Sequence, residues 1–512
     1  MTLRDAVAGL LVVRLGNNLP PAVTASAAAD DVARLLDRHP VGGLILFNGR
    51  WPETRDALVR LQAHSDRGLL VTTDMERGLG QQVAGATLYP HSAAWARIGD
   101  ADAVRTFAAQ ASREALACGI HVTYSPVADV DRNPANPIIG ARAFGPDPVE
   151  AARLTAAFVA GVHDAGQFAT AKHFPGHGAT AGDSHAELPT VDDDRATLEA
   201  TDLVPFRAAF DAGADLVMTA HVVYPALDTR PATQSAAILR TLLRDEMGFD
   251  GVVVTDSLQM AGAKAAGVTE GEMAVHLLHA GVDLFVDAVD PEGIVEGVAR
   301  AVEDGRLDMA TVEASLARVQ RLRDRLTARF GAGVFRDPSL AYAPETVAHP
   351  DHAAHAEASA RRAVEWARGE APDLGDGEGV VVVAFRRPPL PTESGLLPLA
   401  DAVADALPRA TYSEHVPGRI EDWDALEAQV AAARHVVLFV VSRPAAWHAF
   451  GLPDAERAWA QRVTAERDAT LVVLGDRRGL AGFDAAPRAV VAYSDVPASQ
   501  RAALALVTGR PA

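Results

Sequence analysis

Short runs of apolar and β-branched residues recur along the first part of the chain, and each is followed by a segment whose apolar positions repeat every three or four residues. Such runs are typical of buried strands, and the segments between them are typical of amphipathic helices. The strand candidates are Leu10–Leu15, Gly43–Phe47, Leu69–Thr73, His121–Pro126, Phe168–His173, Leu216–Ala220, Val252–Thr255 and Asp283–Asp287. The helix candidates include Val104–Ala117, Glu150–His163, Asp202–Ala212 and Gly271–His279. The alternation predicts parallel strands joined by helices.

Eight strands of this kind fit a single closed barrel. Their interiors are almost wholly apolar, as expected for parallel strands that are covered on both faces. We therefore expect an α/β fold that begins with a (β/α)8 barrel of the TIM type. The alternative is an open, doubly wound sheet.

The pattern changes after the barrel. Residues 331–350 are rich in Gly and Pro and lack periodicity, which favours a connecting segment. A helix is expected over 351–368, and four strand candidates follow at Val380–Ala384, Val436–Ser442, Thr470–Leu474 and Val490–Tyr493. The predicted domains are a catalytic barrel at 1–335, a linker at 336–350 and a smaller three-layer α/β domain at 351–512. The second domain has no Gly-rich phosphate loop, so a nucleotide-binding role has little support.

Composition narrows the class of protein. Apolar residues make up 49% of the chain, enough for sizeable cores, and 67 acidic against 47 basic residues give a net charge of −20. Such a field repels nucleic acid and anionic membranes. The longest apolar runs, such as Val436–Val441, are far shorter than the roughly 18 residues of a membrane span. Asp5 and Arg14 interrupt the N-terminal apolar stretch, which does not resemble a signal peptide. We expect a cytoplasmic enzyme, with its oligomeric state left open.

Two residue types are unusually rare. The single cysteine, Cys118, excludes a disulfide framework and a cysteine-based metal site. Only Lys172 and Lys264 among the 47 basic residues are lysines. A lysine kept in an arginine-rich chain is expected at a position that the larger, planar guanidinium does not fit.

Ionisable residues follow six of the predicted strands. In a (β/α)8 barrel the chemistry takes place at the C-terminal ends of the strands. Each buried charge must be paired, so one shared pocket explains the set better than six separate structural contacts. The residues are Asp74; Asp129 and Asp131; Lys172, His173 and His177; His221; Asp256; and Asp287.

The set favours sugar chemistry. No G-x-S-x-G sequence lies near a strand end, and His173 and His177 fall in a Pro/Gly loop rather than on one helix face, so neither a serine hydrolase nor a zinc site is favoured. We expect neither a metal nor a cofactor. The carboxylate of Asp256 suits nucleophilic attack. The side chains that could surround a polyhydroxylated substrate with donors and acceptors are Asp74, Arg142, Lys172 and His173.

The loop after the fifth strand adds an acid–base candidate. Within it, Asp183 stands two residues before His185. A carboxylate that bonds one ring nitrogen raises the basicity of the other, which tunes a histidine for proton transfer near neutral pH. The alternative interpretation is an Asx turn beside a surface histidine.

A longer motif contains this pair. The sequence K-H-F-P-G-H-G-x-T-x-x-D-S-H-x-x-L-P at 172–189 resembles the signature of bacterial β-N-acetylhexosaminidases in glycoside hydrolase family 3. Four further segments resemble the family in the family's order: TDMERG at 73–78, IIGARAFG at 138–145, MTAHVVYPALD at 218–228 and TDSLQM at 255–260. The resemblance covers about residues 1–330, and the run EASARRAV at 357–364 is similar to the start of the second domain in longer members.

The resemblance implies a role for seven residues. Asp256 would be the nucleophile, His185 the general acid/base, and Asp183 its orienting partner, in place of the second carboxylic acid of most retaining glycosidases. The expected sugar contacts are Asp74, Arg142, Lys172 and His173. The implied activity is a retaining exo-hydrolase that releases N-acetylglucosamine from peptidoglycan fragments or chitooligosaccharides. The alternatives are a phosphorylase that uses phosphate in the second step, a β-glucosidase-like variant and a non-catalytic sugar-binding relative.

Two positions depart from the family pattern. Many members carry an arginine in a G-G-R-V-x-R stretch, where this chain has RGLGQQ at 77–82. Arg77 and Gln82 are the two candidates for the missing contact. Ala179 stands where an aspartate is common.

Overall fold

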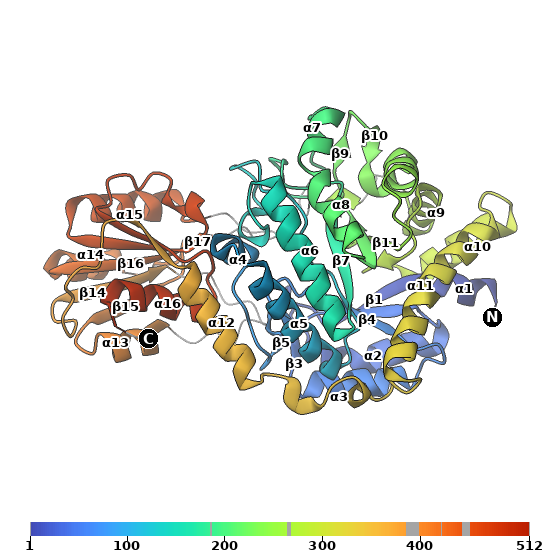
Figure 1. Ribbon diagram of the computed structural model, residues 1–512, viewed down its shortest axis with the longest axis horizontal. Coiled ribbons are helices and arrows are strands. Elements are labelled where there is room, and N and C mark those ends of the chain that lie inside the picture. The colour runs from blue at the N-terminus through green and yellow to red at the C-terminus, as the bar shows by residue number, and fades with distance from the viewer. Residues whose placement is uncertain are drawn as a thin grey trace. The chain divides into compact units, whose positions relative to one another are not determined.

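The computed structural model describes residues 2–184, 187–263, 268–385, 399–420, 422–442 and 451–510. The chain divides into two compact units. Figure 1 shows the ribbon coloured by residue number from blue at the N-terminus to red at the C-terminus. Unit 1 comprises residues 1–87, 100–136 and 143–352, and unit 2 comprises residues 88–99, 137–142 and 353–512. The expected domain boundaries at 335 and 350 remain a prediction.

Unit 1 contains the predicted barrel. Its parallel sheet has the order β11-β8-β7-β6-β4-β2-β1-β12, and a further parallel bridge from Val254 to Leu284 joins the two ends. Each strand matches a run expected from the sequence, so the barrel is confirmed and the open doubly wound sheet is wrong. The strands are β1 (Leu11–Leu15), β2 (Gly43–Leu46), β4 (Leu70–Thr73), β6 (Val122–Thr123), β7 (Phe168–Phe174), β8 (Leu216–Thr219), β11 (Val252–Thr255) and β12 (Phe285–Val286).

Helices cover the outside of this sheet, and α5 and α6 pack side by side there (Figure 1). Both end at a glycine in the left-handed conformation, Gly119 and Gly166, which lets the chain turn back toward the next strand. The helices are α1 (Leu3–Ala8), α2 (Ala25–Arg38), α3 (Glu53–Gln62), α5 (Ala101–Cys118), α6 (Pro148–Ala165), α7 (Arg195–Ala200), α8 (Leu203–Asp211), the π-helix η4 (Ala237–Glu246), α9 (Glu270–Ala280), α10 (Pro291–Glu303) and α11 (Met309–Phe330). Short strands in the loops are β3 (Gly49–Arg50), β5 (Val83–Ala84), β9 (Val223–Tyr224) and β10 (Asp228–Pro231).

Helix α11 packs against the N-terminal end of the barrel. Its Val319, Leu322 and Leu326 share one buried cluster with residues of all eight strands or their immediate ends. Its arginines bond groups that precede the strands: Arg323 donates to the carbonyls of Gly42 and Gly68. This end of the barrel is therefore filled, and the C-terminal ends of the strands are left for chemistry.

Unit 2 is the expected smaller α/β domain. Its sheet has the order β13-β18-β17-β16-β14-β15, in which β13 is antiparallel to β18 and the other pairs are parallel. Alternate residues of β14, β16 and β17 enter two separate cores, one with α14 and α15 and one with α13 and α16, which makes three layers. The strands are β13 (Glu365–Arg368), β14 (Val380–Phe385), β15 (Thr411–His415), β16 (His435–Ser442), β17 (Ala469–Gly475) and β18 (Arg488–Val491). The helices are α4 (Ser92–Ile98), α12 (Pro350–Ala363), α13 (Leu399–Ala406), α14 (Trp423–Ala432), α15 (Asp454–Glu466) and α16 (Pro497–Thr508).

The predicted helix over 351–368 is too long. The helix ends at Ala363, and Glu365–Arg368 form the edge strand β13 instead. Pairing with β18 decides this conformation, because the four residues have no strand-like apolar run of their own.

Two segments that lie within the barrel's sequence group with unit 2, namely 88–99 and 137–142. In the first, the Trp95 side chain is fully buried and its ring meets that of His355 edge-on at 5.6 Å. His91 lies 2.8 Å from the hydroxyl of Ser494. Unit 2 is thus built from three separate stretches of chain.

Candidate active site

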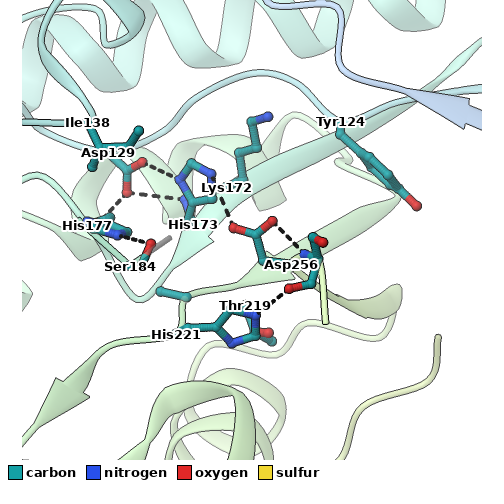
Figure 2. Close-up of polar contacts among 12 residues, drawn as sticks. Tyr124, Asp129, Ile138, Lys172, His173, His177, Ser184, Thr219, His221 and Asp256 are labelled. Atoms are coloured by element: carbon teal, nitrogen blue, oxygen red, sulfur yellow. Dashed lines mark hydrogen bonds and ion pairs between the residues drawn. The ribbon is translucent and has the colours of Figure 1, made fainter. Parts of the chain in front are cut away.

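The polar residues that follow the barrel strands gather at one end of the sheet, where Figure 2 shows several of them converging around Asp256. β4 contributes Asp74, β6 leads to Asp129, β7 carries Lys172 and His173, and β11 ends before Asp256. The parallel arrangement brings these residues together, since all C-terminal strand ends meet on one face of the barrel.

Lys172 pairs with two carboxylates. Its Nζ lies 2.6 Å from Asp74 Oδ1 and 2.8 Å from Glu76 Oε1, and its side chain is 2% exposed. The Asp74 side chain is 26% exposed. The ammonium therefore lies behind Asp74 and fixes the direction of a carboxylate that faces the pocket.

Asp129 orients His173. The buried Asp129 carboxylate accepts the backbone N–H groups of His173 (3.1 Å) and His177 (2.6 Å), and its Oδ2 lies 2.7 Å from His173 Nδ1. A carboxylate at this position keeps the proton on Nδ1. The other ring nitrogen, Nε2, lies 3.9 Å from Asp256 Oδ2 (Figure 2).

The two oxygens of Asp256 differ. Oδ1 accepts the backbone N–H of Ser257 at 2.7 Å, whereas Oδ2 faces the imidazole of His173. The side chain is 21% exposed, so part of the carboxylate remains accessible from solvent. The arrangement has the geometry of a carboxylate nucleophile held in one orientation.

Tyr124, directly after β6, lies near three of these carboxylates. Its side chain is fully buried, and this burial, with the nearby charges of Asp74, Asp287 and Asp256, raises the pKa of the hydroxyl far above its usual range. The residue stays neutral at all physiological pH values, and the three carboxylates share its neighbourhood.

The loop after β7 is tightly packed up to its last described residue. His177 Nδ1 lies 2.9 Å from the Thr180 hydroxyl, and Nε2 lies 2.9 Å from the Ser184 hydroxyl. A side chain at Gly178 would meet the Val130 carbonyl, because a Cβ there would lie 1.7 Å from that oxygen. Asp183 is half-buried, and His185 lies outside the described residues, so the acid–base pair remains a prediction.

Arg142 and the two candidates for the missing arginine have separate environments. Arg142 lies at the end of η2 (Gly140–Arg142) in unit 2, where its Nη1 donates to the Ile138 carbonyl at 3.0 Å. Its sugar contact remains a prediction. Gln82 is 5% exposed and accepts a hydrogen bond from Asn18 Nδ2 at 3.0 Å, while Arg77 is 8% exposed.

Comparison with known proteins gives the family. Residues 2–322 match the model of the glycosyl hydrolase family 3 N terminal domain. The chain belongs to glycosyl hydrolase family 3. Beta-hexosaminidase A of Pseudoalteromonas piscicida is 32% identical over 365 residues, which are 63% of this chain and 58% of that relative. A beta-hexosaminidase of Xanthomonas oryzae is 37% identical over 287 residues, 54% of this chain and 84% of the relative.

Solved structures extend the likeness to both units. A family 3 beta-N-acetylglucosaminidase from Paenibacillus sp. has a TM-score of 0.85 and 28% identity, covering 100% of this chain and 97% of that one. A beta-glucoside phosphorylase also reaches a TM-score of 0.85, at 18% identity over 100% of this chain and 93% of its own. The second likeness shows the fold alone. The family membership expected from the signature is confirmed.

Several side chains of this family 3 site were not among the sequence-based candidates. Glu76 shares Lys172 with Asp74, and Arg14, at the end of β1, pairs with Asp287. Glu76 lies inside the TDMERG segment, whose resemblance to the family could have indicated it as a site residue. The sequence shows Arg14 only as a charge within an apolar run and does not indicate its partner, which is 273 residues away.

Two absences hold for the described part of the chain. Its helices include none that is long and apolar enough to cross a membrane. No three or more His, Cys, Asp or Glu side chains within these ranges are grouped so that they could hold a metal ion.

Proposed function

We propose that this chain is a retaining, exo-acting β-N-acetylhexosaminidase that releases N-acetylglucosamine from peptidoglycan fragments or chitooligosaccharides. The observation that carries the reaction is the orientation of Asp256, with Oδ1 bonded to the Ser257 amide and Oδ2 beside His173 Nε2. The signature at 172–189 and the relatives named beta-hexosaminidase support the choice of sugar.

The proposed reaction is a double displacement. Asp256 Oδ2 attacks the anomeric carbon while the glycosidic bond breaks, and His185 gives a proton to the departing oxygen. In the second step His185 takes a proton from water, whose oxygen attacks the same carbon and releases Asp256. Asp183 orients His185, and two inversions leave the anomeric configuration unchanged.

Four residues would bind the sugar. Asp74 would accept hydrogen bonds from its hydroxyl groups. Lys172, which also pairs with that carboxylate, would donate to them. His173, fixed by Asp129, donates or accepts through Nε2 beside the reacting carbon. Arg142 would supply a further donor.

Phosphorolysis is the second candidate, because the first half-reaction is the same and phosphate would replace water. The charges favour water. Five carboxylates follow the barrel strands, against the cations Lys172, Arg14 and the proposed sugar contact Arg142. The carboxylates are Asp74, Glu76, Asp129, Asp256 and Asp287. Such an excess repels a phosphate dianion.

A panel of aryl β-glycosides tests the proposal, with the N-acetylglucosaminide, glucoside and xyloside each assayed with and without phosphate. We expect the N-acetylglucosaminide to be cleaved fastest and the free sugar to be the product in both buffers. Asp256→Asn should lower kcat by at least about 10⁴-fold while the melting temperature stays near that of the parent. Sugar 1-phosphate as the main product would establish the phosphorylase, and a loss of only a few-fold in Asp256→Asn would reject the nucleophile.

A further inference from the structure

Asp287 is a buried carboxylate directly after β12. Its side chain is fully buried, and its oxygens accept hydrogen bonds from Arg14 Nε (2.7 Å), the Ser257 hydroxyl (2.6 Å) and Gln259 Nε2 (2.9 Å). Its backbone φ is +64°, in the left-handed region that is unfavourable for a non-glycine residue. A strained residue persists only where its surroundings hold it firmly, and such residues cluster at active sites.

The turn that carries Asp256 is held on several sides. The Ser257 amide bonds Asp256 Oδ1, and the Ser257 hydroxyl donates to Asp287. The Ser257 carbonyl lies 3.3 Å from His221 Nε2, and the next amide, that of Leu258, donates to the Val286 carbonyl at 3.0 Å. The peptide unit that orients the nucleophile is thus fixed to β12 and to the loop after β8.

We propose that Arg14 and Asp287 are positioning residues for the nucleophile: their ion pair fixes Ser257, whose amide holds Asp256 Oδ1 and leaves Oδ2 to attack the sugar. This inference rests on the proposed function. Neither residue needs to touch the substrate, since both act through Ser257.

The ion pair also sets the local charge. Asp287 would be a second negative charge beside Asp256 if Arg14 did not neutralise it, and a like charge makes a carboxylate harder to ionise. Other groups around this site come from four further elements and are unchanged by a substitution at Arg14. His173 on β7 faces Asp256 directly, and Tyr124 after β6 lies among the same carboxylates. His221 after β8 contacts the Ser257 carbonyl, and Lys172 with Asp74 and Glu76 forms a separate cluster at the neighbouring strand ends. Removing the Arg14 charge should therefore raise the pKa of Asp256.

A similar pair at the other end of the barrel supplies a matched control. Arg325 Nη1 lies 2.5 Å from Asp215 Oδ1, and the Asp215 side chain is fully buried like that of Asp287. Asp215 precedes β8 and bonds the amide of Ala169, at the start of β7. Asp215 also lies 2.8 Å from His163 Nε2, and Arg325 is the more exposed arginine. Arg325→Gln therefore removes an arginine from a buried carboxylate without touching the turn of Asp256.

The experiment compares the parent with Arg14→Gln, Arg14→Gln/Asp287→Asn and Arg325→Gln. For each variant, kcat/KM is measured against pH on the best aryl glycoside, and the melting temperature is recorded. We expect Arg14→Gln to lose about 10- to 100-fold in kcat/KM, with its acidic limb moved to higher pH. In the double variant the acidic limb of the pH profile should return toward its position in the parent. In Arg325→Gln the acidic limb should stay at the parent's position. An unmoved limb in Arg14→Gln, or an equal movement in Arg325→Gln, would overturn the proposal.

A second measurement needs no turnover. A carbodiimide with an amine labels protonated carboxyl groups, and mass spectrometry follows the labelling of Asp256 as pH rises. We expect the label to persist to higher pH in Arg14→Gln than in the parent. If the parent cleaves no aryl glycoside, the proposed function fails, while an unchanged labelling midpoint rejects the positioning role alone.

Discussion

At the scale of single residues, Lys172 is the side chain whose identity the surroundings restrict most clearly. It is 2% exposed and contacts Asp74 and Glu76 at 2.6 and 2.8 Å. An ammonium is compact and donates in three directions, whereas a guanidinium is larger and planar. The rarity of lysine in this chain and the crowding around Lys172 point to the same conclusion.

We predict that Lys172→Arg lowers kcat/KM by at least about tenfold, or about 1.4 kcal/mol of transition-state stabilisation. The larger group should displace Asp74, so KM is expected to rise. Lys172→Met serves as the comparison, because it keeps the length of the chain but removes the charge. Near-parental kinetics in Lys172→Arg, measured on the preferred aryl glycoside, would contradict the prediction.

Residue chemistry was partly predictable from the sequence. The strand-end rule picked out Asp74, Lys172, His173 and Asp256, and the structure brings these four to one pocket. The rule did not predict which side chain each of them contacts. For example, Asp129 orients His173 through a contact between residues 44 positions apart in the sequence. Pairings of this kind follow from the closure of the barrel, which no local pattern records.

At the scale of elements, α11 contributes both apolar packing and hydrogen bonds to one end of the barrel. Its apolar face fills the N-terminal end of the barrel, and its arginines bond the backbone carbonyls there. Arg323 is 4% exposed, and burial lowers the pKa of its guanidinium to about 10, so it stays charged at neutral pH. One guanidinium satisfies two carbonyls, which a lysine cannot do with the same planar geometry.

We predict that Arg323→Met lowers the free energy of unfolding by at least about 2 kcal/mol, because it removes two charge-assisted hydrogen bonds from the barrel. The Gly68 carbonyl loses its Arg323 donor, and the Gly42 carbonyl keeps only the Leu70 amide. Arg321→Met is the matched control from the same helix. Its side chain is 53% exposed, so its loss should cost about 1 kcal/mol or less. Denaturant unfolding of both variants measures the difference, and equal losses would show that burial of the guanidinium is not the cause.

The strands that sequence reasoning located are those buried on both faces. All eight barrel strands and the four central strands of unit 2 are apolar runs, and each was found. The short loop strands of unit 1 were not predicted, and in unit 2 neither were β13 and β15. The latter two lie at the edges of their sheet and have sequences of mixed polarity, EWAR and TYSEH. An edge strand is half-solvated, so its conformation depends on the neighbour it pairs with rather than on its own composition.

At the scale of the whole molecule, Glu114 contacts two residues at which the chain leaves unit 1. It is fully buried, accepts the Thr87 amide at 3.0 Å and lies 2.6 Å from His352 Nδ1. Thr87 and His352 are the last residues of unit 1 before the chain enters unit 2. The barrel therefore fixes these two exits from its own side.

We predict that a chain ending at His352 is less stable than the full chain and self-associates. Tyr89 and Trp95 are fully buried in unit 2, and removal of residues 353–512 exposes both rings, each of which buries about 150–250 Å². Size-exclusion chromatography and thermal unfolding measure the effect. Tyr89→Ser with Trp95→Gln in the shortened chain should restore the monomer, and a monomeric, equally stable truncation would contradict the prediction.

The division of unit 2 into three stretches also limits how such a protein arises by recombination. A gene fusion at residue 352 joins the second domain as one block, but it supplies neither 88–99 nor 137–142, which lie within the coding sequence of the barrel. Gaining or exchanging this domain therefore requires three matched changes in the gene. A library of chimeras between family 3 members would then keep its stability only where the two internal loops and the C-terminal domain descend from the same parent.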